Sequence, residues 1–143
     1  MFDASLTIVG EAGEDDISAI GFTGGGVTID GGDDNDVLGG SPGPDDISGG
    51  NGDDLFVSSP GDDMMDGGAG NDRYEDETDD GDDDFNGGTG FDFVRLGSPT
   101  VSSVSIDVGG PDSATLAATT LMGISTVDAV SYTHLTLPTS GVV

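Results

Sequence analysis

The chain of 143 residues contains no cysteine, no lysine and no tryptophan. Without cysteine it can form no disulfide and can hold no metal through thiolates. No apolar run is long enough to cross a bilayer, so no transmembrane segment is expected. The first residues lack the basic and apolar regions of a secretory signal peptide, so none is expected there. The length favours one domain.

Basic side chains are almost as scarce. The chain has two basic residues, Arg73 and Arg95, and 29 acidic residues, which gives a formal net charge of −27. This charge disfavours nucleic acid and acidic membranes as partners. The stretch between Gly10 and Arg95 holds 25 of the 29 acidic residues and 22 of the 27 glycines. Such a segment has too few large apolar side chains to fold alone, so it either stays disordered or is neutralised by a cation.

Glycine, aspartate and single apolar residues recur with a period of nine. Residues 49–57 read GGNGDDLFV, 67–75 read GGAGNDRYE and 87–95 read GGTGFDFVR, with the common form G-G-x-G-x-D-x-U-x, where U is apolar. A fixed period interrupted by two short insertions, at residues 19–21 and 76–77, predicts a repeat architecture with the extra residues in loops. The apolar position falls at Ile8, Ile17, Ile29, Leu38, Ile47, Phe56, Met65, Tyr74, Phe85 and Val94.

Each part of the repeat has a physical role. Glycine allows positive φ and tight turns, and it lets backbone carbonyls approach one another. Calcium takes six to eight oxygen ligands, which one carbonyl-rich turn with one carboxylate supplies only in part. The apolar triplets are expected to form very short strands, and the G-G-x-G-x-D stretches are expected to form turns.

The pattern resembles the RTX, or hemolysin-type, calcium-binding nonapeptide repeat family. The resemblance implies an all-β fold: a right-handed parallel β-roll, or calcium-stabilised β-solenoid, with a short irregular β-containing C-terminal segment. In this family two nonapeptides make one coil, and each Ca²⁺ lies between turns on the same edge. Roughly four to six ions are expected, each with about six ligands.

Carried onto this chain, the resemblance implies ligands of two kinds. The carboxylates are expected from Asp36, Asp45, Asp54, Asp63, Asp72, Asp83 and Asp92. They would pair along each edge as Asp36 with Asp54, Asp45 with Asp63, Asp54 with Asp72, Asp63 with Asp83 and Asp72 with Asp92. The carbonyls are expected from Gly31, Asp33, Asn35, Gly40, Pro42, Pro44, Gly49, Asn51, Asp53, Asp62, Gly67, Ala69, Asn71, Gly87, Thr89 and Phe91.

Two features limit this assignment. The insertion at residues 19–21 argues against a further pair between Asp15 and Asp36. For any single aspartate, a solvated turn residue is the alternative interpretation. The apolar residues are expected to divide between two facing stacks, with Leu38, Phe56, Tyr74 and Val94 in one and Ile47, Met65 and Phe85 in the other.

The repeat pattern divides the chain. Residues 1–30 are expected to form N-terminal coils with degenerate repeats, 31–95 the calcium-binding roll and 96–129 a post-repeat β and connector segment. Within the last, residues 101–108 predict a strand, 109–112 a turn and 120–127 a connector. Residues 130–143 are expected to be a non-native tail, because VSYTHLTLPT resembles a translated sequencing adapter.

No catalytic residue is expected. Residues 39–43 satisfy G-x-S-x-G, but this motif needs a preceding strand, a following helix and a histidine base. The resemblance implies calcium binding within a larger secreted bacterial protein that folds outside the cell after type I secretion. The alternatives are a structural spacer of a repetitive adhesin, an accessory domain of a secreted enzyme, and a permanently disordered acidic tract.

Overall fold

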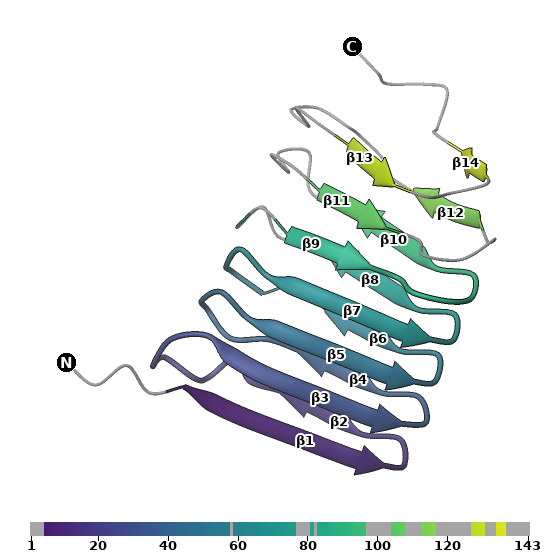
Figure 1. Ribbon diagram of the computed structural model, residues 1–143. Coiled ribbons are helices and arrows are strands. Elements are labelled where there is room, and N and C mark those ends of the chain that lie inside the picture. The colour runs from purple at the N-terminus through teal and green to yellow at the C-terminus, as the bar shows by residue number, and fades with distance from the viewer. Residues whose placement is uncertain are drawn as a thin grey trace.

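The chain forms a ladder of short parallel strands that stack as a β-solenoid (Figure 1). This computed structural model describes residues 5–57, 59–76, 81 and 83–96, together with the strands at 104–107, 113–116, 127–130 and 134–136. Among the described residues, no helix is long and apolar enough to cross a membrane. The all-β parallel roll predicted from the sequence is therefore confirmed.

Two parallel sheets of seven strands each form the two faces of the roll, and the chain alternates between them. The first sheet contains β1 (Leu6–Ala12), β3 (Val27–Asp33), β5 (Asp46–Asn51), β7 (Met64–Ala69), β9 (Asp83–Asn86), β11 (Val104–Asp107) and β13 (Val127–Val130). The second contains β2 (Asp16–Ser18), β4 (Val37–Gly39), β6 (Leu55–Val57), β8 (Arg73–Asp76), β10 (Phe93–Leu96), β12 (Ser113–Leu116) and β14 (His134–Thr136).

The strand register follows the nine-residue period. Leu38 pairs with Phe56, and Phe56 pairs with Tyr74, so two nonapeptides make one coil. On the opposite sheet Ile47 pairs with Met65, and Met65 pairs with Phe85. The two stacks predicted from the sequence are confirmed. Alternation along each strand turns these residues inward and their neighbours outward.

The core is one side-chain layer thick, with a single file of inward residues on each sheet. Phe56, Tyr74 and Phe85 are fully buried. The ring of Phe85 meets Phe56 edge-on, with centroids 5.6 Å apart, and stacks on Tyr74 at 5.7 Å. These aromatic contacts join the two sheets in the middle of the roll. So thin a core gives each large side chain an unusually large share of the stability.

Strand lengths differ from the expectation in one respect. The glycine pairs were expected in turns, yet Gly32 pairs with Gly50 and Gly50 pairs with Gly68 as continuations of β3, β5 and β7. Glycine has no side chain to separate the coils, so the parallel ladder runs on into the turn. The strands of the first sheet are accordingly longer than apolar triplets.

The two insertions are accommodated differently. Residues 19–21 lie in the loop between β2 and β3, as predicted. Asp76 was expected in an inserted loop, but it ends β8 and is buried. Its backbone pairs with Leu96 of β10, so the ladder extends the strand by one residue. Glu77 lies outside the described residues.

Stacking continues beyond the nonapeptides. A short irregular but β-containing C-terminal segment was expected, and its strands continue the roll: β11 and β13 extend the first sheet while β12 and β14 extend the second. Parallel pairing uses backbone groups, so it continues on the edges of β9 and β10 after the glycine pattern ends. The strand expected at residues 101–108 contains β11. The turn at 109–112 and residues 120–126 of the connector lie outside the described residues.

Phe85→Ala should destabilise the calcium-saturated chain by about 3–5 kcal/mol, because it removes both ring contacts and leaves a cavity. Chemical denaturation followed by circular dichroism measures the change. Phe91→Ala is the matched control, because Phe91 is 64% exposed and its loss should cost within about 0.5 kcal/mol. Equal effects of the two substitutions would contradict the single-file core.

Candidate metal centre

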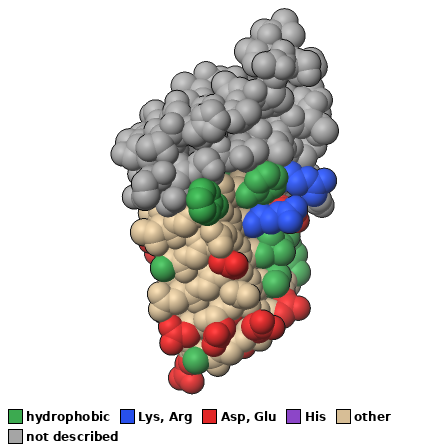
Figure 2. All heavy atoms as spheres, turned by 90° about the vertical axis from the view of Figure 1, so that its right-hand side faces the viewer, with side chains coloured by type: hydrophobic (Ala, Val, Ile, Leu, Met, Phe, Trp, Pro, Cys, Tyr) green, Lys and Arg blue, Asp and Glu red, His purple; other side chains and the backbone are tan. Residues whose placement is uncertain are grey.

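The turns of the roll form two edges with different chemistry. We call the turns that follow the first five odd-numbered strands, at residues 10–15, 31–36, 49–54, 67–72 and 87–92, the glycine edge. The turns that follow β2, β4 and β6, together with residues 81 and 83, form the serine edge. Figure 2 views the glycine edge, where backbone and uncharged polar atoms cover much of the surface and acidic side chains gather toward the N-terminal coils.

Aspartates line the glycine edge one above the other. Asp36, Asp54 and Asp72 are each 1% exposed. In every case carboxylate oxygen Oδ1 accepts a hydrogen bond from the backbone N–H of the aspartate one coil earlier. Asp36 donates to Asp54, and Asp54 donates to Asp72, both at 2.9 Å. These bonds fix the carboxylates at constant register.

The second oxygen of these carboxylates has no hydrogen-bond partner. Oδ2 of Asp15, Asp36, Asp54 and Asp72 is buried and unpartnered in the described structure. A buried acceptor left unsatisfied costs about 1–3 kcal/mol, and more when it is charged. A row of such oxygens pointing into the same edge is the arrangement that a bound cation would neutralise.

The first glycine of each turn shapes the space around these oxygens. A methyl carbon on Gly49 would overlap Oδ2 of Asp54 and lie 2.8 Å from the carbonyl oxygen of Gly67. Carboxylate and carbonyl oxygens from successive coils therefore converge over Gly49. Gly10, Gly31 and Gly67 are placed in the same way.

Glycine is required at the second position of each turn for a different reason. Gly50 has φ 108°, and a side chain there would overlap the carbonyl oxygen of Gly32. Equivalent positive φ values occur at Gly32, Gly68 and Gly88, and Glu11 takes this conformation at 79° in the first coil. The turn backbone of the glycine edge thus repeats from coil to coil.

No three histidine or acidic side chains converge as a metal cluster anywhere in the described part of the chain. A cation at the glycine edge would consequently take most of its ligands from backbone carbonyls, with one or two carboxylates. Such an all-oxygen donor set suits calcium. The residues present therefore fit the ion implied by the repeat.

Burial and mutual repulsion act on the acidity of these groups. Burial, together with the nearby carboxylates of Asp92 and Asp54, raises the pKa of Asp72 to about 7. Burial also raises the pKa of Asp54. In the absence of a cation, the glycine edge therefore favours the protonated forms of these carboxylates.

The predicted carbonyl donors of the glycine edge lie in its turns, where side chains form a second ladder. The side-chain oxygen of Asn35 accepts the backbone N–H of Asp53 at 2.7 Å, and Asp53 in turn accepts the N–H of Asn71 at 2.7 Å. Asn71 accepts the N–H of Phe91 at 2.9 Å. These exposed side chains align successive turns.

The serine edge satisfies its carboxylates with hydroxyl groups. Asp45 accepts the hydroxyl of Ser41 at 2.8 Å and the backbone N–H of Ser41 at 2.6 Å. The hydroxyl of Ser59 donates to Oδ2 of Asp63 at 3.0 Å. The predicted carboxylate ligands Asp45 and Asp63 therefore lie in register, but their oxygens already accept hydrogen bonds.

A buried tyrosine completes this edge. The phenol of Tyr74 crosses the core and donates to Oδ2 of Asp83 at 2.5 Å. Burial raises the pKa of Tyr74, with Asp83 adding to the rise, so the phenol stays protonated as a donor.

Sequence reasoning missed four participants. Asp15 accompanies Asp36, because its N–H donates to Oδ1 of Asp36 at 2.8 Å. The insertion at residues 19–21, which made this pair doubtful, lies on the opposite edge and leaves Asp15 in register with Asp36. The register of Asp15 could have identified it. Serine at the second glycine position was the one signal for Ser41 and Ser59. Nothing in the sequence indicated the role of Tyr74.

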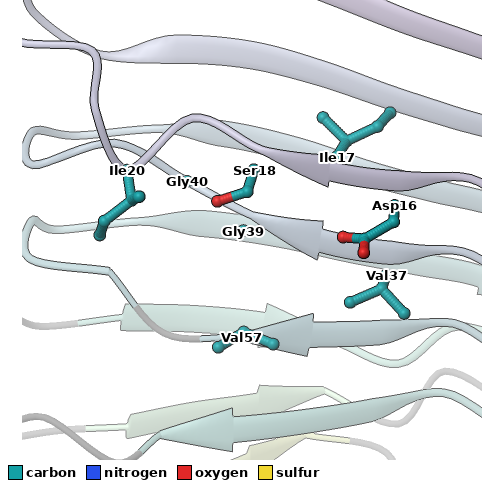
Figure 3. A pocket seen from close by; sticks show the side chains of 8 residues that line it. All are labelled: Asp16, Ile17, Ser18, Ile20, Val37, Gly39, Gly40 and Val57. Atoms are coloured by element: carbon teal, nitrogen blue, oxygen red, sulfur yellow. The ribbon is translucent and has the colours of Figure 1, made fainter.

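The G-x-S-x-G match has no catalytic geometry. Ser41 is fully buried, and its hydroxyl is bonded to Asp45. A shallow hollow nearby, on the outer face of β2, β4 and β6, is lined by Ile20, Val37 and Val57 (Figure 3). Asp16 and Ser18 supply its polar side chains.

A parallel β-solenoid with carboxylates and glycines in register along an edge is the architecture of a metal-binding β-roll. Residues 39–74 and 77–98 match the family model of the RTX calcium-binding nonapeptide repeat, in four copies. This part of the chain is similar to RTX repeat arrays, and RTX nonapeptide repeats bind Ca²⁺. The repeat is a structural calcium-binding unit rather than a catalytic one. No curated protein and no solved structure matches the chain.

Gly49→Ala should raise the calcium concentration needed for folding, because the added methyl overlaps Oδ2 of Asp54. Calcium titration followed by far-UV circular dichroism gives the midpoint. Gly21→Ala is the control, since nothing lies within 4 Å of a methyl at Gly21. Equal midpoints for the two variants would contradict convergence over Gly49.

Acidification should favour folding of the metal-free chain. The folded pKa of Asp72 and Asp63 is about 7 against an ordinary value of 3.8. The folded state therefore binds more protons between these values, and stability falls as pH rises through that window. Far-UV circular dichroism in chelator should show more β-structure at pH 5 than at pH 7.5. A flat profile, or the reverse order, would contradict the raised pKa values.

Proposed function

We propose that this chain is a calcium-dependent folding module whose ions lie along the glycine edge. The observation that supports it most directly is the row of buried, unpartnered Oδ2 atoms at Asp15, Asp36, Asp54 and Asp72. Four successive aspartate pairs connect the coils there, from Asp15–Asp36 to Asp72–Asp92. Each pair would hold one ion, together with carbonyls of the turns predicted from the sequence.

Calcium supplies two positive charges and oxygen coordination when bound. The chain's own residues do the rest: Oδ1 of each aspartate holds the coil before it, and the glycines keep the oxygens close. An ion that binds only the folded roll adds its binding free energy to folding. With a net charge of −27, the folded state depends on that contribution.

We further propose that the roll belongs to a larger secreted bacterial protein and folds outside the cell. Extracellular calcium modules bind with dissociation constants of about 10⁻⁴–10⁻³ M. Sites of this strength stay empty at cytosolic calcium levels and fill after export. The RTX repeat supports type I secretion by resemblance, and the charge supports the expected absence of nucleic acid as a partner.

Calcium should convert the chain from random coil to β-structure, and Asp54→Ala should remove two ions, because Asp54 belongs to two of the pairs. Calorimetry with direct ion counting measures the stoichiometry. Asp46→Ala is the control, since Asp46 is exposed beside the buried Asp45 and should leave the count unchanged. A random-coil spectrum at 10 mM calcium, which is roughly tenfold or more above the expected dissociation constants, would reject the proposal.

A further inference from the structure

We infer that this roll binds calcium on the glycine edge alone, and that hydroxyl groups close the serine edge in place of ions. The inference rests on the proposed function and deepens it by assigning the two edges different roles. It replaces the expectation that Asp45, Asp63 and Asp83 are calcium ligands.

A matched pair of aspartates separates the two edges. Asp63 and Asp72 are buried to 4% and 1% exposure, and each accepts the N–H of the aspartate one coil earlier at 2.9 Å. They differ at the second oxygen. Oδ2 of Asp72 has no hydrogen-bond partner, whereas Oδ2 of Asp63 accepts the hydroxyl of Ser59.

The same contrast holds along the serine edge. Both oxygens of Asp45 are satisfied, because Oδ1 accepts the N–H of Val27 and the hydroxyl of Ser41, and Oδ2 accepts the N–H of Ser41. Oδ2 of Asp83 accepts the phenol of Tyr74. A cation entering this edge would have to displace these donors, all of them in the interior.

The turn backbone provides an independent argument. On the glycine edge the second repeat position has positive φ in every coil, from Glu11 at 79° to Gly32 at 112°. On the serine edge Ser41 and Ser59 occupy this position, and neither is among the described residues with positive φ. The carbonyls of the two turns therefore take different directions.

The environment of the first glycine differs as well. Over Gly49 a carboxylate and the carbonyl of Gly67 converge, but over Gly40 the nearest atoms are Oδ2 of Asp45 and the hydroxyl oxygen of Ser59. A hydroxyl group occupies the place where the glycine edge offers a second oxygen ligand. Serine at the second position also links successive coils, because the hydroxyl of Ser59 lies 3.4 Å from Oδ2 of Asp45.

The full-length chain with Asp72→Asn or Asp63→Asn tests the inference, with bound calcium counted by equilibrium dialysis and elemental analysis. Asparagine keeps an oxygen to accept the backbone N–H and removes the charge. Asp72→Asn should lose two ions per chain, and Asp63→Asn should bind as many ions as the parent. Loss of ions from Asp63→Asn equal to that from Asp72→Asn would overturn the inference while leaving calcium-dependent folding intact. Absence of calcium binding by the parent would instead reject the proposed function, and the inference with it.

Ser59→Ala provides a second test if Asp63→Asn does not fold. Removing the hydroxyl leaves the Asp63 charge in place but takes away its donor. The calcium-saturated variant should unfold at a lower denaturant concentration than the parent, with no ion lost. An unchanged midpoint, or the loss of an ion, would overturn the inference, because the hydroxyl would then be either idle or a calcium ligand.

Discussion

The structure depends on one contact, repeated from coil to coil: a buried carboxylate accepts the backbone N–H of the aspartate one coil earlier. This contact joins each coil to the next at both edges, beside the parallel strand ladders. It also places negative charges directly above one another in the interior, as at Asp36, Asp54 and Asp72. The same carboxylates order the fold and repel one another. Folding therefore depends on a cation that neutralises them.

The remaining architecture follows from that condition. One large apolar side chain per nonapeptide gives a core of single-file thickness, which is too small to stabilise the chain alone. Glycine brings the coils close enough for oxygens to converge, but it increases the entropy lost on folding. The fold therefore depends less on its core than on ion binding at the edge. The ion concentration of the surroundings then controls its stability.

The two edges show how one repeat accommodates two solutions to buried charge. On the glycine edge the second oxygen is left for a cation. On the serine edge the backbone N–H of Ser41, the hydroxyl of Ser59 and the phenol of Tyr74 donate to it. A hydroxyl satisfies an acceptor without neutralising its charge, so burial still raises the pKa of Asp63 to about 7. The edges therefore share an electrostatic cost and differ in what offsets it.

Much of this was determined by the sequence itself. The period of nine located the apolar residues, and the two nonapeptides per coil that the RTX resemblance implies assigned Leu38, Phe56 and Tyr74 to one stack and the facing residues to the other. The family match to RTX repeats followed from the same spacing. What only the tertiary structure decided was which groups meet across coils: that residues 19–21 leave Asp15 in register, and that the hydroxyl of Ser59 reaches Asp45 of the preceding coil. Those contacts depend on which edge a loop lies on and on backbone φ, and neither is encoded in a linear spacing.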